Sequence, residues 1–302
     1  MARRKKGRDI HGILLLDKPS GISSNRALQE MRHFLNARKA GHTGSLDPLA
    51  TGLLPLCFGE ATKISGLMLD DDKSYQVVIQ LGVMTDTGDM EGKIIAEQPV
   101  PKLTQAQLDA CWQHFSGDID QVPPMYSALK HEGKKLYELA REGIQVERKA
   151  RRIRIYHLQQ LNWEGDRLSL AVDCSKGTYI RTLAEDIGHY LGTCATVKAL
   201  RRTGAGIFEI DQAFTLDALK AMTPEAVIQQ LIAVDTPLQN LPAINVSNKQ
   251  ADCIRQGQQL DLNSVDAGTV RMYCGALFLG LGEMRMDGKL APRKLFHLET
   301  TF

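Results

Sequence analysis

Apolar positions in the first two thirds of the chain repeat with two different periods, which predicts both strands and helices. Residues 12–16 form a continuous apolar run, typical of a short buried strand. In residues 75–81 and 168–174 apolar and polar positions alternate, so one face of each strand is expected in the core. Tyr75 begins such a face and is expected in the core or at the edge of a cleft.

Apolar residues three and four positions apart predict helices between these strands. One helix is expected to begin at Ser23 or Ser24, and another follows a capping box formed by Thr104 and Gln107. A third helix follows the strand at 168–174, with Arg181 at the junction between the two. A guanidinium at that junction could hold a carboxylate with two hydrogen bonds.

The pattern changes after residue 240. Segments 270–273 and 277–286, followed by the turn at Asp287 and Gly288, predict a β meander with a hairpin. We therefore expect two domains, 1–240 and 241–302, the second a small all-β unit near the lower size limit for independent folding.

Composition adds few constraints. The 302 residues are 43% hydrophobic and 24% charged with a net charge of +2, which is ordinary for a globular protein without a strong overall field. The six cysteines have no paired spacing, which favours a reducing, cytoplasmic location. The apolar run after the basic N-terminus is too short for a signal peptide, and no segment is long enough to span a membrane.

The candidate chemistry centres on residues 41–55, GHTGSLDPLATGLLP. Its glycines permit tight turns, and Asp47 is held on extended or turn backbone by the proline that follows it. An apolar run, 53–58, would anchor the loop in a core. Such a loop can present one reactive carboxylate. The alternative is that Asp47 and Pro48 form only a turn, with the carboxylate bonded to its own backbone.

Three further polar stretches have alternative interpretations. Lys18 is either a catalytic or phosphate-directed lysine or a plain turn residue. The acidic loop at 85–92 lacks the ligand spacing of a calcium loop, so a hydrogen-bonded turn is favoured. Residues 120–147 look like an inserted lid that carries basic side chains, among them Lys130. The basic run at 148–154 is either a solvated strand face or a phosphate-binding ridge.

Common cofactor and metal signatures are missing from the sequence. It contains no phosphate-binding loop followed by Lys-Ser/Thr, no G-x-G-x-x-G and no H-E-x-x-H. The remaining candidates are a lone carboxylate, a tyrosine, an arginine and basic patches. That set suits a reaction on a charged polymer that needs neither a cofactor nor a metal ion.

These motifs together resemble the bacterial tRNA pseudouridine-55 synthases, the TruB family. The resemblance spans residues 9 to about 210. The matching segments, in order, are 16–21, 41–52, 73–75, 85–87 with Asp89, 124–130, 174–181 and 200–202. It implies an α+β fold with a mixed, mainly antiparallel sheet flanked by helices, and an RNA-gripping insertion at about 120–147. The C-terminal part resembles the PUA RNA-binding module, with a weaker signal.

The resemblance also implies an activity: isomerisation of one uridine in the T arm of tRNA, after the base is flipped out. Asp47 would be the nucleophile or ribose-activating carboxylate, and Arg181 would hold it ionised. Tyr75 would stack on the uracil and could help remove its C5 proton. The expected substrate-binding residues are His42, Tyr75, Tyr179, Leu200, Lys18 and Lys130, with Lys18 supporting the loop rather than performing chemistry.

The implied partner is the T stem-loop of tRNA, with no membrane or protein partner and a monomeric enzyme. Two other classes remain open. One is a non-catalytic RNA binder or RNA-folding chaperone that uses the same basic surface. The other is a glycosidase-like enzyme, which would need a second carboxylate as its acid. No second acid lies in a comparable motif.

Overall fold

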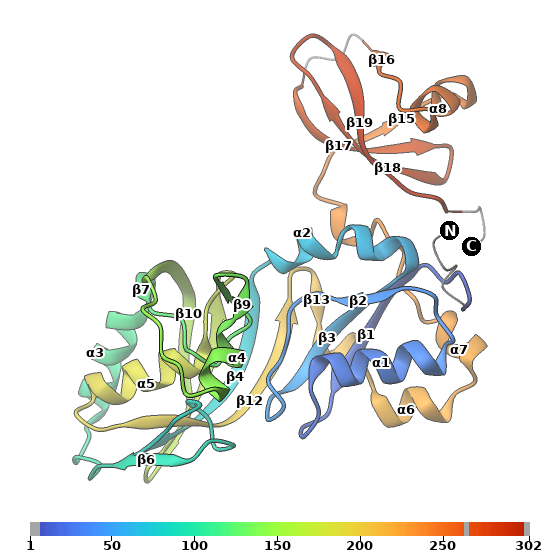
Figure 1. The fold of residues 1–302 in the computed structure, drawn as a ribbon. Helices are drawn as coiled ribbons and strands as arrows, with labels where there is room; N and C mark the ends of the chain where they lie inside the picture. The colour runs from blue at the N-terminus through green and yellow to red at the C-terminus, as the bar shows by residue number, and fades with distance from the viewer. Residues whose placement is uncertain (1–6, 263–265, 299–302) are drawn as a thin grey trace.

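The computed structural model describes residues 7–262 and 266–298. Most of the basic N-terminal run, with which the first expected domain begins, therefore lies outside the described residues. The last four residues of the second expected domain, 299–302, also lie outside them. Within the described part, the strands of a large sheet with flanking helices lie between residues 12 and 215, and a smaller sheet follows it (Figure 1). This is the expected α+β architecture.

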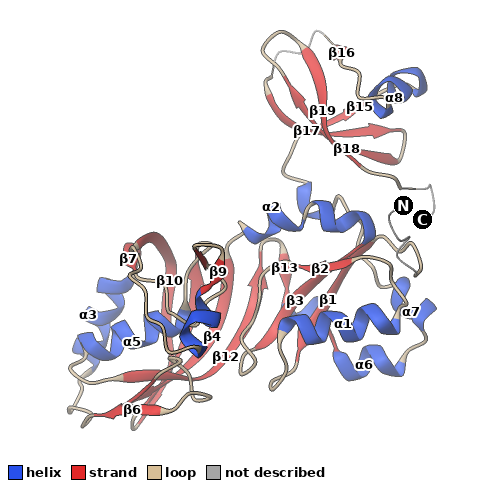
Figure 2. Ribbon diagram, viewed as in Figure 1, coloured by secondary structure: helices blue, strands red, loops and turns tan. Residues whose placement is uncertain are grey.

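The large sheet has ten strands in the described residues, and its main path runs β14-β1-β3-β12-β4-β11-β10-β7. Only the β1–β14 and β3–β12 pairs on this path are parallel, so the sheet is mainly antiparallel, as expected. Figure 2 shows it running the length of the larger part. Its strands are β1 (Gly12–Lys18), β2 (Ala40–His42), β3 (Thr51–Phe58), β4 (Lys73–Leu81), β7 (Gly117–Gln121), β10 (Arg151–Glu164), β11 (Arg167–Cys174), β12 (Ala195–Ala205), β13 (Phe208–Glu209) and β14 (Phe214–Thr215).

Alternation along β1 places its side chains in two separate cores. Leu14 and Leu16 pack in the main core, against which the long helices lie. Ile13 and Leu15 pack on the opposite face, in a second core. Both faces of this strand are covered, which explains why its sequence is continuously apolar rather than alternating.

The long helices begin where their caps predict. Ser23 accepts a hydrogen bond from Arg26 N at the start of α1, and Thr104 and Gln107 form the predicted capping box of α3. Gly192 follows the last turn of α5 with a φ of +79°, a conformation that favours glycine. The helices up to residue 228 are α1 (Ser24–Phe34), α2 (Ser65–Leu69), α3 (Gln105–Phe115), α4 (Leu136–Arg141), α5 (Ile180–Tyr190), α6 (Leu216–Ala221) and α7 (Pro224–Ile228).

Two hairpins project from the large sheet. One pairs β5 (Val83–Thr85) with β6 (Ile94–Glu97). The other belongs to the expected insertion and pairs β8 (Lys130–His131) with β9 (Lys134–Lys135), directly before α4. The insertion has a small core of its own, made by Met125, Leu136 and Leu139.

The C-terminal part is built on the predicted meander but is not purely β. Ser247 and Gln250 form a capping box for a helix, α8 (Asn248–Arg255), which buries Ala251 and Ile254 against the sheet. The expectation of an all-β unit omitted this helix because only two of its residues are buried. The sheet consists of β15 (Ala243–Asn245), β16 (Leu260–Asp261), β17 (Gly268–Cys274), β18 (Leu277–Met284) and β19 (Lys289–Leu295).

The second core joins the C-terminal sheet to the large one. Phe278 and Leu281 of β18 lie in the same apolar cluster as Ile13 and Leu15. The hydroxyl of Tyr273 donates to Asp235, on the segment before the C-terminal sheet, at 2.5 Å. The expected boundary at 240/241 stays a prediction, but the two parts share buried apolar surface.

Candidate active site

The loop that carries Asp47 joins β2 to β3 and is held from both sides. Ser24, in the first turn of α1, brackets Leu46: its hydroxyl accepts from Leu46 N at 2.7 Å and lies 3.0 Å from Leu46 O. Gly21 N donates to Pro48 O at 2.8 Å. Asp47 therefore sits between two anchored neighbours, on a rigid loop.

Lys18 supports this loop through hydrogen bonds to backbone carbonyl groups. Its side chain is fully buried, and its ammonium donates to the carbonyl oxygens of Pro19, Ile22 and Pro48 at 2.8, 2.7 and 3.3 Å. Burial lowers the pKa of Lys18 to about 8. The expectation that Lys18 binds substrate conflicts with this geometry, because all three bonds are made inside the protein. These bonds tie Lys18 to the loop, and its burial contradicts the interpretation as a surface turn lysine.

Asp47 faces the guanidinium of Arg181. The Oδ2 atom lies 2.9 Å from Arg181 Nε, and Oδ1 accepts from Nη2 at 3.4 Å. The carboxylate therefore points away from its own backbone, which argues against the turn-only interpretation. Burial raises the pKa of the Asp47 carboxyl, Arg181 opposes that rise and the Asp89 charge adds to it.

Arg181 is fixed by two backbone carbonyls from separate segments. Its Nη1 donates to Thr87 O and its Nη2 to Tyr126 O, each at 2.6 Å. Two residues before Arg181, the backbone of Tyr179 makes two hydrogen bonds with the side-chain amide of Gln121. The guanidinium is thus oriented before any substrate arrives.

Tyr75 stands on β4 beside β12, where it pairs in register with Arg202. It is half-buried, and burial raises the pKa of its phenol, while the charge of Arg202 opposes the rise. The ring packs against the main core, and Asp47 is close enough to influence the phenol. The structure therefore brings Asp47, Tyr75 and Arg181 to one place.

Arg202 was not among the predicted site residues. It is 1% exposed, and it donates from Nε to Leu53 O at 2.7 Å and from Nη2 to Gly44 O at 3.2 Å. It thereby ties the catalytic loop to β12 and contacts Tyr75. The sequence signal was the basic pair 201–202, but a basic pair ordinarily predicts a surface, not a buried support.

The remaining predicted residues are less closely connected. His42 is half-buried on β2, and burial lowers the pKa of its imidazole. Tyr179 is half-buried, and burial raises the pKa of its phenol. Leu200 is 9% exposed and mostly in the core. Lys130 is exposed on the insertion hairpin, and no hydrogen bond or ion pair in the described residues connects it to Asp47.

The acidic loop at 85–92 is a hydrogen-bonded turn, as favoured. Asp86 accepts from Lys93 N at 2.8 Å. Asp89 accepts from the Thr87 hydroxyl at 2.7 Å and from Glu91 N at 3.1 Å. These bonds use the carboxylates to shape the turn that supplies Thr87 O to Arg181.

A basic cavity of about 560 Å³ adjoins this region. Arg152 and Arg154 are exposed at its wall and make loose ion pairs, 3.6 and 3.9 Å, with Asp120 and Asp118. Leu69, also in its lining, packs near Gly44 of the catalytic loop. The strand face is therefore solvated, and it also borders a hollow that could receive a phosphate.

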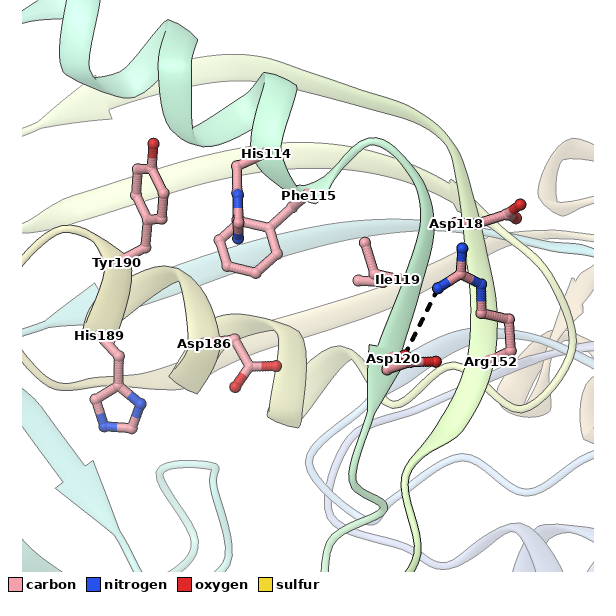
Figure 3. Close-up of a pocket in the computed structure, with 9 residues that line it drawn as sticks. All are labelled: His114, Phe115, Asp118, Ile119, Asp120, Arg152, Asp186, His189 and Tyr190. Atoms are coloured by element: carbon pink, nitrogen blue, oxygen red, sulfur yellow. Dashed lines mark ion pairs between the residues drawn. The ribbon is translucent and has the colours of Figure 1, made fainter.

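A second cavity, of about 690 Å³, lies between α3, α5 and β7 (Figure 3). Its floor includes the stacked rings of His114 and Tyr190, with centroids 4.8 Å apart. None of its lining residues belongs to the Asp47 cluster. Within the described part of the chain, no helix is long and apolar enough to cross a membrane.

Family models match nearly the whole chain. Residues 32–180 match "TruB family pseudouridylate synthase (N terminal domain)", residues 181–239 match "tRNA pseudouridylate synthase B C-terminal domain" and residues 242–296 match "Pseudouridine synthase II TruB, C-terminal".

Curated relatives are similar over their full length. The tRNA pseudouridine synthase B of Serratia proteamaculans (strain 568) is 50% identical over 97% of both chains. That of Azoarcus sp. (strain BH72) is 50% identical over 99% of both.

Solved structures support the fold. A chain of an H/ACA RNP bound to a substrate RNA has a TM-score of 0.72 at 21% identity, covering 99% of this chain and 92% of that one. A chain of the archaeal box H/ACA sRNP Nop10–Cbf5 complex has a TM-score of 0.71 at 22% identity, covering 96% and 87%.

Proposed function

The chain belongs to the TruB family of pseudouridylate synthases, and on that premise we propose that it isomerises uridine 55 in the T arm of tRNA. The observation that carries the proposal is the Asp47–Arg181 pair, in which a partly exposed carboxylate faces a buried, fully oriented cation. Such a pair offers the substrate an ionised, positioned carboxylate.

The reaction breaks the N1–C1′ bond, rotates the uracil and forms a C5–C1′ bond. N1 ends protonated, and C5 gives up its proton to solvent, so the base and ribose keep their composition. Asp47 acts either on the sugar, on the ring or on a ribose proton. In all three cases Arg181 opposes the rise in the Asp47 pKa that burial causes, which favours the ionised carboxylate.

Tyr75 supplies the stacking surface for the detached uracil, and its hydroxyl lies at the C5 edge. Its neutral phenol, which lies near the Arg202 charge, is suited to relaying the C5 proton rather than to acting as a strong base. Tyr179 and the exposed edge of Leu200 line the pocket, and His42 fills the space that the flipped nucleotide leaves in the RNA stack.

Binding must offset the few kcal/mol needed to extrude a nucleotide. The wall of the basic cavity, with Arg152 and Arg154, provides a path for the phosphates, and Lys130 on the insertion adds a contact from the other side. The partner is the T stem-loop of a tRNA bound by a cytoplasmic monomer. Residues 1–240 perform catalysis, and residues 241–302 add RNA-binding surface.

The test is tritium release from tRNA transcripts that carry 5-tritiated uridine at position 55 alone. The parental protein should release the label, and Asp47→Asn should not. A parental protein that binds the tRNA but releases no tritium is an RNA binder or chaperone, and the proposal fails. Uracil freed into solution would instead identify a glycosidase-like enzyme.

A transcript labelled only at another uridine of the T arm is the control for position. Release from that transcript at the same rate would refute the choice of uridine 55 while leaving the isomerase activity intact.

A further inference from the structure

Arg181 depends on the turn at 85–92 for one of its two carbonyl acceptors. Thr87 O accepts from Nη1 at 2.6 Å, and this bond leaves Nε and Nη2 directed at Asp47. A shift of the Thr87 carbonyl would rotate the guanidinium. The position of the turn against α5 therefore helps to set the orientation of Arg181 in its ion pair with Asp47.

The turn rests on α5 through a residue without a side chain. Gly88 is buried with a φ of +76°, and a Cβ atom there would lie 2.6 Å from Glu185 Oε1 and 3.2 Å from Arg181 Cβ. Arg181 and Glu185 are four residues apart on the helix, so they present one face to the turn. Gly88 sits between them, and Val197 N fixes the turn from the other side by donating to Gly88 O at 3.0 Å.

Glu185 is the second of the two α5 side chains that flank Gly88. It is half-buried, with Arg181 and Asp186 beside it on its own helix and Arg148, at the start of the basic run 148–154, facing it. Arg148 in turn donates to Pro123 O at 3.3 Å. Pro123 is three residues before Tyr126, whose carbonyl oxygen is the other acceptor of Arg181. Burial and the Asp186 charge raise the pKa of Glu185 to about 7.

We propose that Gly88 and Glu185 are positioning residues for catalysis: the bare backbone of Gly88, seated against the Glu185 carboxyl, places Thr87 O where it orients Arg181 toward Asp47. The proposal rests on the proposed function for its kinetic consequence, but its structural content is independent of it. Neither residue contacts the substrate.

The first test is Gly88→Ala. An added methyl group would lie between Glu185 Oε1 and Arg181 Cβ and must displace the Glu185 carboxyl or the turn. Glu185 no longer holds the turn in place once it is displaced, and a misplacement of the turn by about 1 Å typically costs about 10²-fold in rate. The single-turnover rate of pseudouridine formation should fall by about that factor, while tRNA affinity stays within about threefold because the phosphate contacts are untouched.

Gly192→Ala is the matched control. Gly192 has a φ of +79°, almost the same as Gly88, lies at the end of the same helix and has nothing within 4 Å of an added Cβ. The Gly192→Ala variant has the backbone strain of a positive φ but no steric contact with the added methyl group. Its single-turnover rate should therefore equal the parental rate. An equal loss in Gly192→Ala would attribute the effect to strain alone and overturn the proposal.

Removing the clashing carboxyl should restore activity. Gly88→Ala combined with Glu185→Ala should be at least about tenfold faster than Gly88→Ala alone, and no gain would refute the contact. If Gly88→Ala does not fold, the test rests on Glu185 alone. Glu185→Gln, which keeps the shape of the side chain, should stay near the parental rate, whereas Glu185→Ala should lose about tenfold; a parental rate for Glu185→Ala would refute the proposal.

A crystal structure of a folded Gly88→Ala variant, or of Glu185→Ala in its place, separates this proposal from the proposed function. The guanidinium of Arg181 should be displaced and its bond to Thr87 O lost, whatever the enzyme acts on. An unmoved guanidinium would overturn the positioning role even if the parental protein is an active synthase.

Discussion

Arg181 and Asp47 form an ion pair whose members differ sharply in burial: the arginine side chain is 6% exposed and the aspartate side chain 41%. The cation is enclosed by protein carbonyls, while the anion remains open to a ligand. An arrangement that served only stability would have no need to leave its carboxylate accessible. This asymmetry supports the proposed reactive role of Asp47 and the proposed orienting role of Arg181.

Asp47→Asn should abolish pseudouridine formation while tRNA affinity stays within about tenfold of the parent, because phosphate contacts supply most of the affinity. Single-turnover tritium release and an equilibrium binding titration measure the two quantities. Asp166→Asn, which removes one member of an exposed ion pair in the turn between β10 and β11, is the control and should be indistinguishable from the parent. Substantial turnover by Asp47→Asn would contradict the assignment of Asp47.

Tyr75→Phe keeps nearly all of the ring's contact area but removes the hydroxyl, which lies near the Arg202 charge. General acid–base help is typically worth about 10²–10⁴-fold, so net turnover should be lost to that extent. We expect the block after glycosidic cleavage and before release of the C5 proton. Trapping a rearranged, C5-protonated nucleoside would locate it there.

Tyr190→Phe is the control for loss of a tyrosine hydroxyl, because Tyr190 is 45% exposed and lies outside the Asp47 cluster. Tritium release by Tyr75→Phe at the parental rate would leave Tyr75 as a stacking surface only.

Local patterns predicted the elements well, because their causes are local. The capping box at Thr104 and the alternation in residues 168–174 involve neighbours in sequence, and both were found as predicted. Helix α8 was missed although its capping box at Ser247 is equally regular. Its apolar stripe is too short to distinguish a helix from the surrounding turns.

The site itself could be assembled only through the family resemblance. Asp47 and Arg181 are 134 residues apart, and no spacing rule connects them. The burial of Lys18 and Arg202 was beyond the sequence, because a buried cation depends on carbonyl groups that distant loops bring to it. Those two residues determine how rigidly Asp47 is presented.

Phe278→Ala should destabilise both sheets together, because Phe278 fills the core that β18 shares with β1. Loss of a buried phenylalanine typically costs about 3–5 kcal/mol. Denaturant unfolding should remain one transition, with its midpoint lowered. Met286→Ala is the control: this side chain is 90% exposed, and its loss should change stability by less than about 0.5 kcal/mol. Two separate transitions, with the larger part unaffected, would show that the C-terminal part folds independently.

Glu185 should make the stability of the protein depend on pH. Burial raises the pKa of its carboxyl from 4.5 to about 7 in the folded protein. Between these values the folded state holds a proton that the unfolded state has released. The stability from this group is therefore fully present below pH 4.5 and is lost as the pH rises through about 7.

The measurement is the free energy of unfolding of the parent and of Glu185→Gln at several pH values from 4.5 to 8. Glutamine keeps the shape and cannot titrate, so the other carboxyl groups cancel in the difference between the two curves. That difference should shift in favour of Glu185→Gln as the pH rises, by about 1–3 kcal/mol in total. Parallel curves across this range would mean that Glu185 titrates with an ordinary pKa. The contact region between Gly88 and α5 would then be more open to water than the packing around Arg181 indicates.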